Sequence, residues 1–202
     1  MERGGRGIIF VVSAPSGAGK TTLLKEVISR LPGVSLSVSC TTRDPRKGER
    51  DRVDYTFISR QGFLDMVREG KFIEWAEVHG DLYGTPRSNL GKLQTGEDLI
   101  LEIDTQGART IKEELKRGVL IFILPPSHKI LRERLMARNG DSKEAIKARL
   151  QNAKKELDQV TWYDYIVINE DIEEAVKELI SIIIAERCRS HRVLKGIGGE
   201  HG

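Results

Sequence analysis

A phosphate-binding loop is indicated by the stretch SAPSGAGKTT near the N-terminus. Gly17 and Gly19 let backbone N–H groups converge on an anion, while Lys20 offers a charge to outer phosphates and Thr21 a hydroxyl to Mg²⁺. The pattern G-x-x-x-x-G-K-[ST] is incomplete, because Ala14 stands where its first glycine belongs. A small residue can serve there if its φ stays negative. The alternative is a glycine-rich turn beside a solvated lysine.

A second group of phosphate ligands is suggested by the stretch TTRDPRKGERDR. Arg43 and Arg46 stand on either side of Pro45, which stiffens the loop, and arginine binds phosphate oxygens in pairs through its planar fork. In a chain that already has a phosphate loop, such a site would hold a second phosphorylated substrate. The alternatives are a solvated basic loop and, less favoured because aromatic residues make up only 5% of the chain, a nucleic-acid site.

A purine-recognition site is suggested by Glu74, within the alternating stretch FIEWAEV, and by Thr85 in the turn that follows. A carboxylate accepts hydrogen bonds from N1–H and the 2-amino group of guanine, and a hydroxyl donates to O6. Adenine would present a lone pair at N1 to the carboxylate and would be rejected. The alternative is that Glu74 simply lies on the solvent face of a half-buried strand.

Asp104 opens the stretch DTQG, which imitates the D-x-x-G motif of GTPases. The guanine-recognition motif [NT]-K-x-D does not occur downstream, which disfavours a GTPase. Asp104 follows an apolar run, so we expect it at the carboxyl end of a strand and near Mg²⁺.

Four apolar runs predict the strands that position these residues. They are Ile8–Val12, Leu99–Ile103, Val119–Leu124 and Tyr165–Ile168. Such runs are typical of strands buried on both faces of a parallel sheet. Helical periodicity follows each of them, at residues 22–30, 108–115, 129–138 and 172–187. The alternation predicts an α/β fold with a parallel sheet flanked by helices.

The composition agrees with one soluble α/β protein. The chain has 202 residues and a net charge of +3, so bulk charge does not argue for nucleic acid. Its two cysteines match no metal-binding spacing and indicate a reducing compartment. The apolar runs are too short for a signal peptide or a membrane span, so we expect a cytoplasmic location.

The motifs together resemble those of guanylate kinases along nearly the whole chain. The matching blocks include SAPSGAGKTTL, SVSCTTRDPRKGE, FIEWAEVHGDLYGT and LILEIDTQGA, in family order and spacing. The resemblance implies a single domain, residues 1–202, with a P-loop NTPase-type core (about 7–35, 97–125 and 157–190). It also implies an inserted mixed α/β GMP-binding subdomain (about 36–90) and a helical lid (about 126–156).

The resemblance also implies a role for individual residues. The ligands of ATP would be Ser16, Gly17, Ala18, Gly19, Lys20, Thr21, Thr22 and Asn169, the last near the adenine. The ligands of GMP would be Ser39, Arg43, Arg46, Tyr55, Glu74, Tyr83, Thr85, Glu102 and Asp104. The catalytic cations would be Lys20, Arg43, Arg46, Arg134, Arg138 and Arg149, and Mg²⁺ would be held by Thr21 with the ATP phosphates.

The implied reaction is Mg²⁺-dependent transfer of the ATP γ-phosphoryl group to GMP or dGMP, which gives ADP and GDP for purine metabolism. We then expect small-molecule partners only, no nucleic acid or membrane, and a monomer or homodimer. Three alternatives stay open: a phosphopeptide-binding scaffold module, a kinase for another phosphate ester, and a GTPase.

Overall fold

The central sheet is parallel and, within the described residues, has five strands in the order β2-β7-β1-β8-β9. The computed structural model describes residues 7–78, 80–115, 117–136 and 143–197, with the side chains of all but residues 128, 143–149 and 195–197. The strands are β1 (Ile9–Ser13), β2 (Val34–Leu36), β7 (Asp98–Glu102), β8 (Val119–Leu124) and β9 (Tyr165–Ile168). β1 is central and pairs with both β7 and β8.

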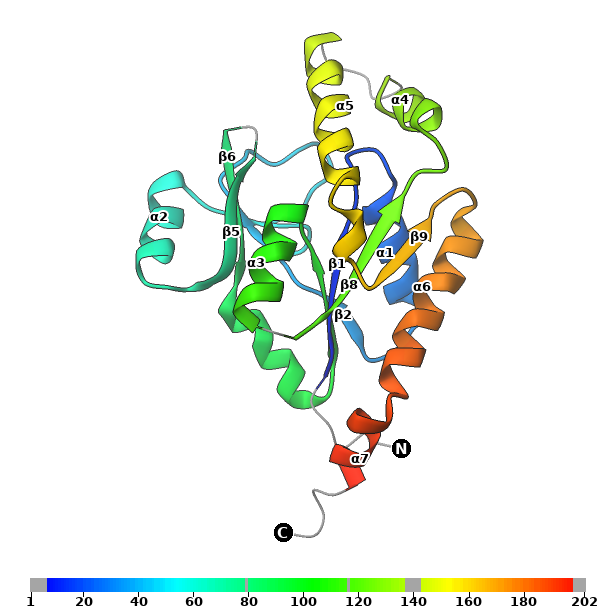
Figure 1. Cartoon of the computed structure of the whole chain (residues 1–202). Coiled ribbons are helices and arrows are strands. Elements are labelled where there is room, and N and C mark those ends of the chain that lie inside the picture. Colours follow the sequence, from blue (N-terminus) through cyan, green and yellow to red (C-terminus); the bar gives the residue numbers. More distant parts are fainter. Residues whose placement is uncertain (1–6, 79, 116, 137–142, 198–202) are drawn as a thin grey trace.

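Helices cover both faces of this sheet (Figure 1). On one face α1 (Lys20–Arg30) and α6 (Ile172–Arg187) pack on side chains such as Phe10 and Val12. On the other face α3 (Thr105–Leu115) and the 3₁₀ turn η2 (Val160–Trp162) pack near Ile9 and Val11. Burial on both faces explains why β1, β7 and β8 are continuous apolar runs rather than alternating ones. The strand β9 differs, because its Ile166 and Ile168 are exposed.

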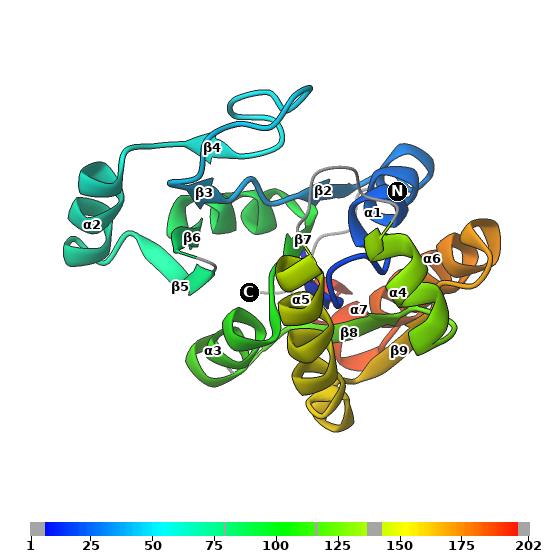
Figure 2. The same ribbon diagram turned by 90° about the horizontal axis from the view of Figure 1, so that it is seen from above.

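A second, four-stranded sheet has the order β4-β3-β6-β5 and stands beside the central one (Figure 2). Its strands are β3 (Cys40–Thr41), β4 (Thr56–Phe57), β5 (Phe72–Val78) and β6 (Asp81–Pro86). Helix α2 (Arg60–Arg68) packs on it through Phe63, which stacks on Phe72. The 3₁₀ segment η1 (Arg87–Thr95) leads back to the central sheet.

Two further helices, α4 (His128–Met136) and α5 (Lys143–Leu157), stand above the carboxyl ends of the central strands (Figure 1). They pack on one another through a small apolar cluster of Leu131, Leu135 and Ala153. This cluster is separate from the two clusters of the central sheet. The α4–α5 unit therefore has its own packing above the core.

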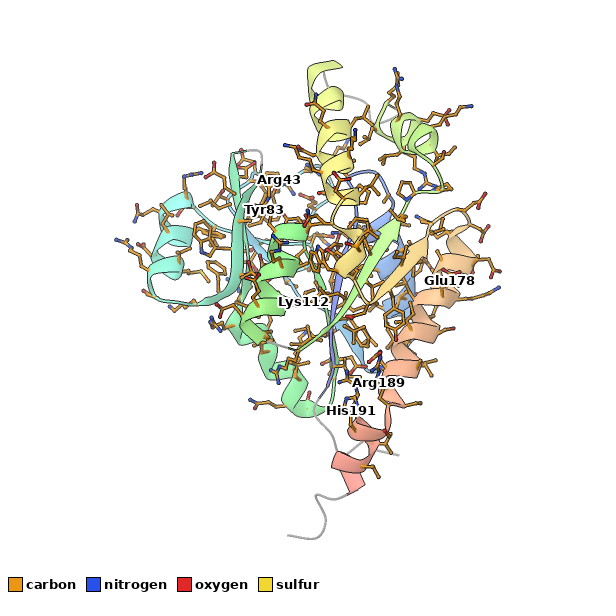
Figure 3. All side chains as sticks on the ribbon, viewed as in Figure 1. Arg43, Tyr83, Lys112, Glu178, Arg189 and His191 are labelled. Carbon is orange, nitrogen blue, oxygen red and sulfur yellow. The ribbon has the colours of Figure 1, made fainter. Side chains whose placement is uncertain are left out.

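At the end of the molecule opposite to α4 and α5, a buried ion pair connects the end of α6 to the start of β7. Arg187, at the end of α6, donates from Nε to Asp98 Oδ2 at 2.6 Å, and Asp98 Oδ1 accepts from the backbone N of Ile8 at 2.7 Å. Arg187 Nη2 also donates to the carbonyls of Pro32 and Gly33. The short helix α7 (Ser190–Ile197) follows at this end, where Figure 3 labels Arg189 and His191. In the part of the chain that the structure describes, no helix has the length and apolar character needed to cross a bilayer.

The α/β class and the four predicted strands are confirmed, two of them shifted by one residue. β2 was not predicted, and its last residue, Leu36, belongs to the central sheet. The helix predicted from residue 22 begins at Lys20, and the one predicted from residue 108 begins at Thr105. The division into core, GMP-binding subdomain and lid stays a prediction.

Candidate active site

The phosphate loop lies between β1 and α1. Gly17 and Gly19 have φ values of 92° and 89°, in the left-handed region that favours glycine. Arg52 is the only non-glycine residue with positive φ among those described, so the φ of Ala14 is not positive and the condition for an alanine there is met. The loop therefore keeps its conformation without the first glycine of the motif.

The two chemical groups at the start of α1 both contact the end of β7. Lys20 Nζ donates to the carbonyl of Ile103 at 3.2 Å. Thr21 Oγ1 donates to Glu102 Oε1 at 2.7 Å. The sheet order explains this contact, because β7 is the neighbour of β1 and the carboxyl ends of parallel strands share one edge.

Asn169 and Arg134 both donate hydrogen bonds to a backbone carbonyl of the phosphate loop. Asn169, which directly follows β9 and is buried, donates from Nδ2 to the Ala18 carbonyl at 2.6 Å. Arg134 on α4 donates to the carbonyls of Ala18 (3.4 Å) and Asn169 (3.3 Å). A Cβ at Gly19 would lie 2.5 Å from Asn169 Nδ2, so glycine is required there for space as well as for its φ.

A cleft of about 1290 Å³ opens beside the phosphate loop. One wall is formed by the loop and α1, and another by the loop that contains Arg43 and Arg46. The first turns of α3 and one face of α5 close the remaining sides. In Figure 3, Arg43 and Tyr83 lie close together at the upper end of the four-stranded sheet, toward this cleft.

Arg43 is fixed by several neighbours on its side of the cleft. Its Nη2 donates to both carboxylate oxygens of Glu49, at 2.9 and 3.0 Å, and its Nη1 donates to the Asp44 carbonyl at 2.6 Å. The guanidinium also lies 5.6 Å from the ring centre of Tyr55, which meets Tyr83 edge to face. Arg43, Arg46, Tyr55 and Tyr83 all line the large cleft.

A smaller cavity of about 170 Å³ opens from the same region and is lined by Glu74 together with Ser39, Tyr83 and Asp104. Glu74 is only 6% exposed, so the solvent-face alternative is wrong. Thr85, which is fully buried, donates its hydroxyl to Glu74 Oε1 at 2.5 Å. Burial raises the pKa of Glu74 to about 7; the Thr85 hydrogen bond opposes this shift and the charge of Asp104 adds to it.

Gly107 on α3 makes room for the Glu74 carboxylate. A Cβ at this position would lie 2.6 Å from Glu74 Oε2. The backbone N of Gly107 donates to Asp104 Oδ1 at 2.8 Å, which fixes the aspartate at the start of α3. Gly107 thus leaves space for one carboxylate of the small cavity, that of Glu74, and fixes another, that of Asp104.

The structure brings most of the predicted site residues together. The large cleft is lined by Ser16, Gly17, Gly19, Lys20, Thr21, Thr22, Ser39, Arg43, Arg46, Tyr55, Tyr83, Glu102 and Asp104. Glu74 lines the small cavity. Within the described residues, neither cavity is lined by Ala18, Thr85, Arg134 or Asn169, which contact other residues of the site instead. Arg138 and the side chain of Arg149 lie outside the described residues.

Several lining residues were not predicted. They include Glu49, Arg109, Asn152, Lys155, Glu156 and Gln159. Asn152, Lys155 and Glu156 are spaced to share one face of α5, a signal that the sequence contained. Burial raises the pKa of Glu156 to about 7; the charge of Lys20 lowers it and that of Asp104 raises it.

Comparison with known proteins identifies the family of the chain. The family model described as guanylate kinase matches residues 6–186. The guanylate kinase of Geobacter metallireducens is 52% identical over 192 residues, which are 95% of each chain. That of Thermotoga maritima is 46% identical over 188 residues, 93% of this chain and 91% of the relative.

A solved structure gives the same result. The crystal structure of guanylate kinase from Anaplasma phagocytophilum has a TM-score of 0.77 and is 38% identical in sequence. The match covers 93% of this chain and 90% of that one. By its sequence, its fold and the residues that its cleft gathers, the chain belongs to the guanylate kinase family.

Proposed function

We propose that the chain transfers the γ-phosphoryl group of ATP to GMP, giving ADP and GDP, and that dGMP is accepted as well. One observation carries the proposal: Lys20 of the phosphate loop and the pair Arg43 and Arg46 line the same cleft from different walls. A kinase of nucleoside monophosphates needs two anions held in line, and these are two separate sets of cations.

On the donor side, the phosphate loop would hold the ATP phosphates at the start of α1. Backbone N–H groups between Ser16 and Thr22 and the positive end of the helix dipole favour an anion there. Lys20, whose ammonium contacts the Ile103 carbonyl in the described structure, would turn to the outer phosphates. Arg134, Arg138 and Arg149 are proposed to add charge from the lid.

Oxygen ligands suitable for Mg²⁺ are gathered next to the phosphate loop. The Thr21 hydroxyl, the Glu102 carboxylate and Asp104 all line the cleft, and Thr21 and Glu102 are 2.7 Å apart. Such hard oxygen donors fit Mg²⁺, which prefers carboxylate, hydroxyl, phosphate and water oxygens. When bound with ATP, Mg²⁺ would neutralise charge on the phosphate oxygens.

On the acceptor side, Arg43, Arg46, Tyr55 and Tyr83 would hold the GMP phosphate. The acceptor is itself a phosphate, whose second pKa is about 6, so it is already ionised near pH 7 and needs no general base. The site residues then have two tasks, to align the two anions and to neutralise their charge. Both tasks suit arginine and lysine.

Glu74 would select guanine by accepting from N1–H and the 2-amino group. Ser39 and Asp104 line the same small cavity and would contact the base as well, with Glu102 near the ribose or the base. Because the Thr85 hydroxyl donates to Glu74, it would act by orienting the carboxylate. Adenine would face that carboxylate with a lone pair and bind poorly.

A coupled ADP-release assay with ATP and Mg²⁺ tests the proposal, with GMP, AMP, UMP and dTMP offered in turn. We expect release with GMP alone. Release without any acceptor would point to a nucleoside triphosphatase. No release from folded protein with any acceptor would favour a phosphopeptide-binding module.

A further inference from the structure

We infer that Glu49 is a positioning residue that presents Arg43 and Arg46 to the acceptor phosphate. Glu49 lies in the loop between β3 and β4, lines the large cleft and has no role in the proposed reaction so far. The inference rests on the proposed function, because it gives the acceptor-phosphate site a residue that acts through the arginines.

Glu49 contacts the side chain of Arg43. Both carboxylate oxygens of Glu49 accept from Arg43 Nη2, and the two side chains are only 20% and 13% exposed. A charge-assisted hydrogen bond in such a sheltered place fixes the guanidinium in one orientation. Arg43 Nε is buried and has no hydrogen-bond partner among the described residues, so the pairing leaves part of the fork uncommitted.

Glu49 also contacts the backbone of Arg46. Glu49 Oε2 accepts from the backbone N of Arg46 at 2.7 Å, and the backbone N of Glu49 donates to the Arg46 carbonyl at 3.0 Å. Gly48, with φ of 91°, supplies the left-handed residue that this tight turn needs. One carboxylate therefore ties both arginine positions to the same turn.

A competing interpretation is that Glu49 imitates the acceptor phosphate and must leave before GMP binds. The geometry favours positioning, because departure of Glu49 would also open the turn through the Arg46 backbone contact. Arg43 is held in addition by the Asp44 carbonyl and lies 5.6 Å from the Tyr55 ring centre and 5.9 Å from that of Phe57. The orientation of the Arg43 guanidinium is thus fixed by several contacts, of which the Glu49 carboxylate is one.

The two interpretations predict opposite signs for Glu49→Gln. The glutamine keeps the length but removes the charge, and its NH₂ group cannot accept from Arg43 Nη2. If Glu49 positions the arginines, the KM for GMP rises roughly tenfold, as expected for loss of one charge-assisted contact, while the KM for ATP is unchanged. If Glu49 competes with the phosphate, removal of its charge lowers the KM for GMP.

The experiment measures both KM values, kcat and the melting temperature for wild type, Glu49→Gln and the control Glu77→Gln. Glu77 lies on β5 and pairs with Arg60 of α2 at 3.3 Å. In the described part of the chain it lines neither cavity, so its substitution should leave both KM values unchanged. A double-mutant cycle with Arg43→Lys adds a test of the route. If Glu49 acts through Arg43, Glu49→Gln has a much smaller effect in the Arg43→Lys background.

Titration with inorganic phosphate separates this inference from the proposed function. Wild-type turnover with GMP tests the function itself, whereas weaker phosphate binding by Glu49→Gln than by wild type tests the positioning role without any nucleotide. A lower KM for GMP, tighter phosphate binding, or equal increases in both KM values with a lower melting temperature would each overturn the inference.

Discussion

Lys20 illustrates how a single residue of the site can be tested. Its ammonium contacts the Ile103 carbonyl at the edge where β7 and β1 end, which is the edge at which the donor phosphates are proposed to bind. Lys20→Ala should lower kcat by roughly 10²-fold or more, as expected when a preorganised cation is removed from a transferring phosphoryl group. ADP release at saturating substrates measures this. Lys177→Ala, an exposed lysine paired with Glu174 on α6, is the control and should keep wild-type turnover.

In the proposed function, base selection depends on the charge of Glu74. Glu74→Gln keeps the shape of the side chain but offers one acceptor oxygen where guanine presents two donors. We expect the preference for GMP over AMP, as a ratio of kcat/KM values, to fall by roughly 10- to 100-fold. Assays with the two acceptors in parallel measure the ratio. An unchanged ratio would remove Glu74 from the base site.

The raised pKa of Glu74 makes GMP binding depend on pH. Guanine donates to the ionised carboxylate, so affinity for GMP should weaken as the pH falls below about 7, where Glu74 becomes protonated. Calorimetric titration with GMP from pH 6 to 8 measures this, and Glu74→Gln should reduce the pH dependence to the part caused by the GMP phosphate, whose second pKa is about 6. Glu156, whose pKa is also raised to about 7, is the comparison: Glu156→Gln should retain the dependence.

The same shift has a consequence for folding with a defined sign. Between the ordinary pKa of 4.5 and the raised value, the folded chain binds more protons at Glu74 than the unfolded chain, so stability falls as the pH rises. Glu74→Gln abolishes this penalty. The ligand-free variant should therefore melt higher than wild type at pH 8, with a smaller difference at pH 5. A difference independent of pH would contradict this explanation.

Residue types and spacing predicted much of the site but not its contacts. Lys20, Arg43 and Glu74 stand in motifs whose chemistry is evident from the sequence. Glu49 could not be found in this way, because its partners are set by a tight turn and by one side-chain conformation of Arg43. Thr85 was predicted to contact the base, whereas in the described structure its hydroxyl donates to Glu74.

At the scale of elements, the packing of α3 against β5 sets how closely the four-stranded sheet approaches the helix on the central sheet. Gly107 permits their close approach, since a Cβ there would lie 2.6 Å from the Glu74 carboxylate. Gly107→Ala should therefore displace Glu74 and raise the KM for GMP roughly tenfold, with the KM for ATP unchanged. The control is Gly91→Ala in η1, where the Cβ would meet open space. Equal effects on both substrates would indicate a general loss of packing.

Strands that consist of apolar runs of four residues or more were predicted more reliably than the shorter strand β2. The apolar runs predicted the bounds of β8 and β9 without error. Burial on both faces explains the run of β8, whereas in β9 Ile166 and Ile168 are about half exposed. β2, with three residues, is too short for any periodicity, and its place beside β7 depends on tertiary pairing. The start of α6 is fixed by a cap, because Asp171 accepts from the backbone N of Glu174 at 3.0 Å.

At the scale of the molecule, the Asp98–Arg187 pair joins segments that are distant in sequence. Arg187→Met would leave Asp98, which is 5% exposed, without its cation, and removal of one partner of a buried pair costs about 3–5 kcal/mol. We expect the melting temperature to fall by roughly 10 °C while both KM values stay unchanged, since the pair is remote from the cleft. Thermal denaturation and substrate titration measure the two effects. Lys177→Met, at an exposed site on the same helix, should change neither.

The shared cleft has a consequence for ligand design. The small cavity and the large cleft have lining residues in common, among them Lys20, Tyr83 and Asp104, so the two proposed nucleotide sites share one continuous space. An inhibitor that joins two nucleosides through a polyphosphate bridge could occupy both ends at once. The bridge would convert the second binding event into an intramolecular one, with an effective concentration set by its length. Affinity should therefore peak at one bridge length and decline for shorter and longer bridges.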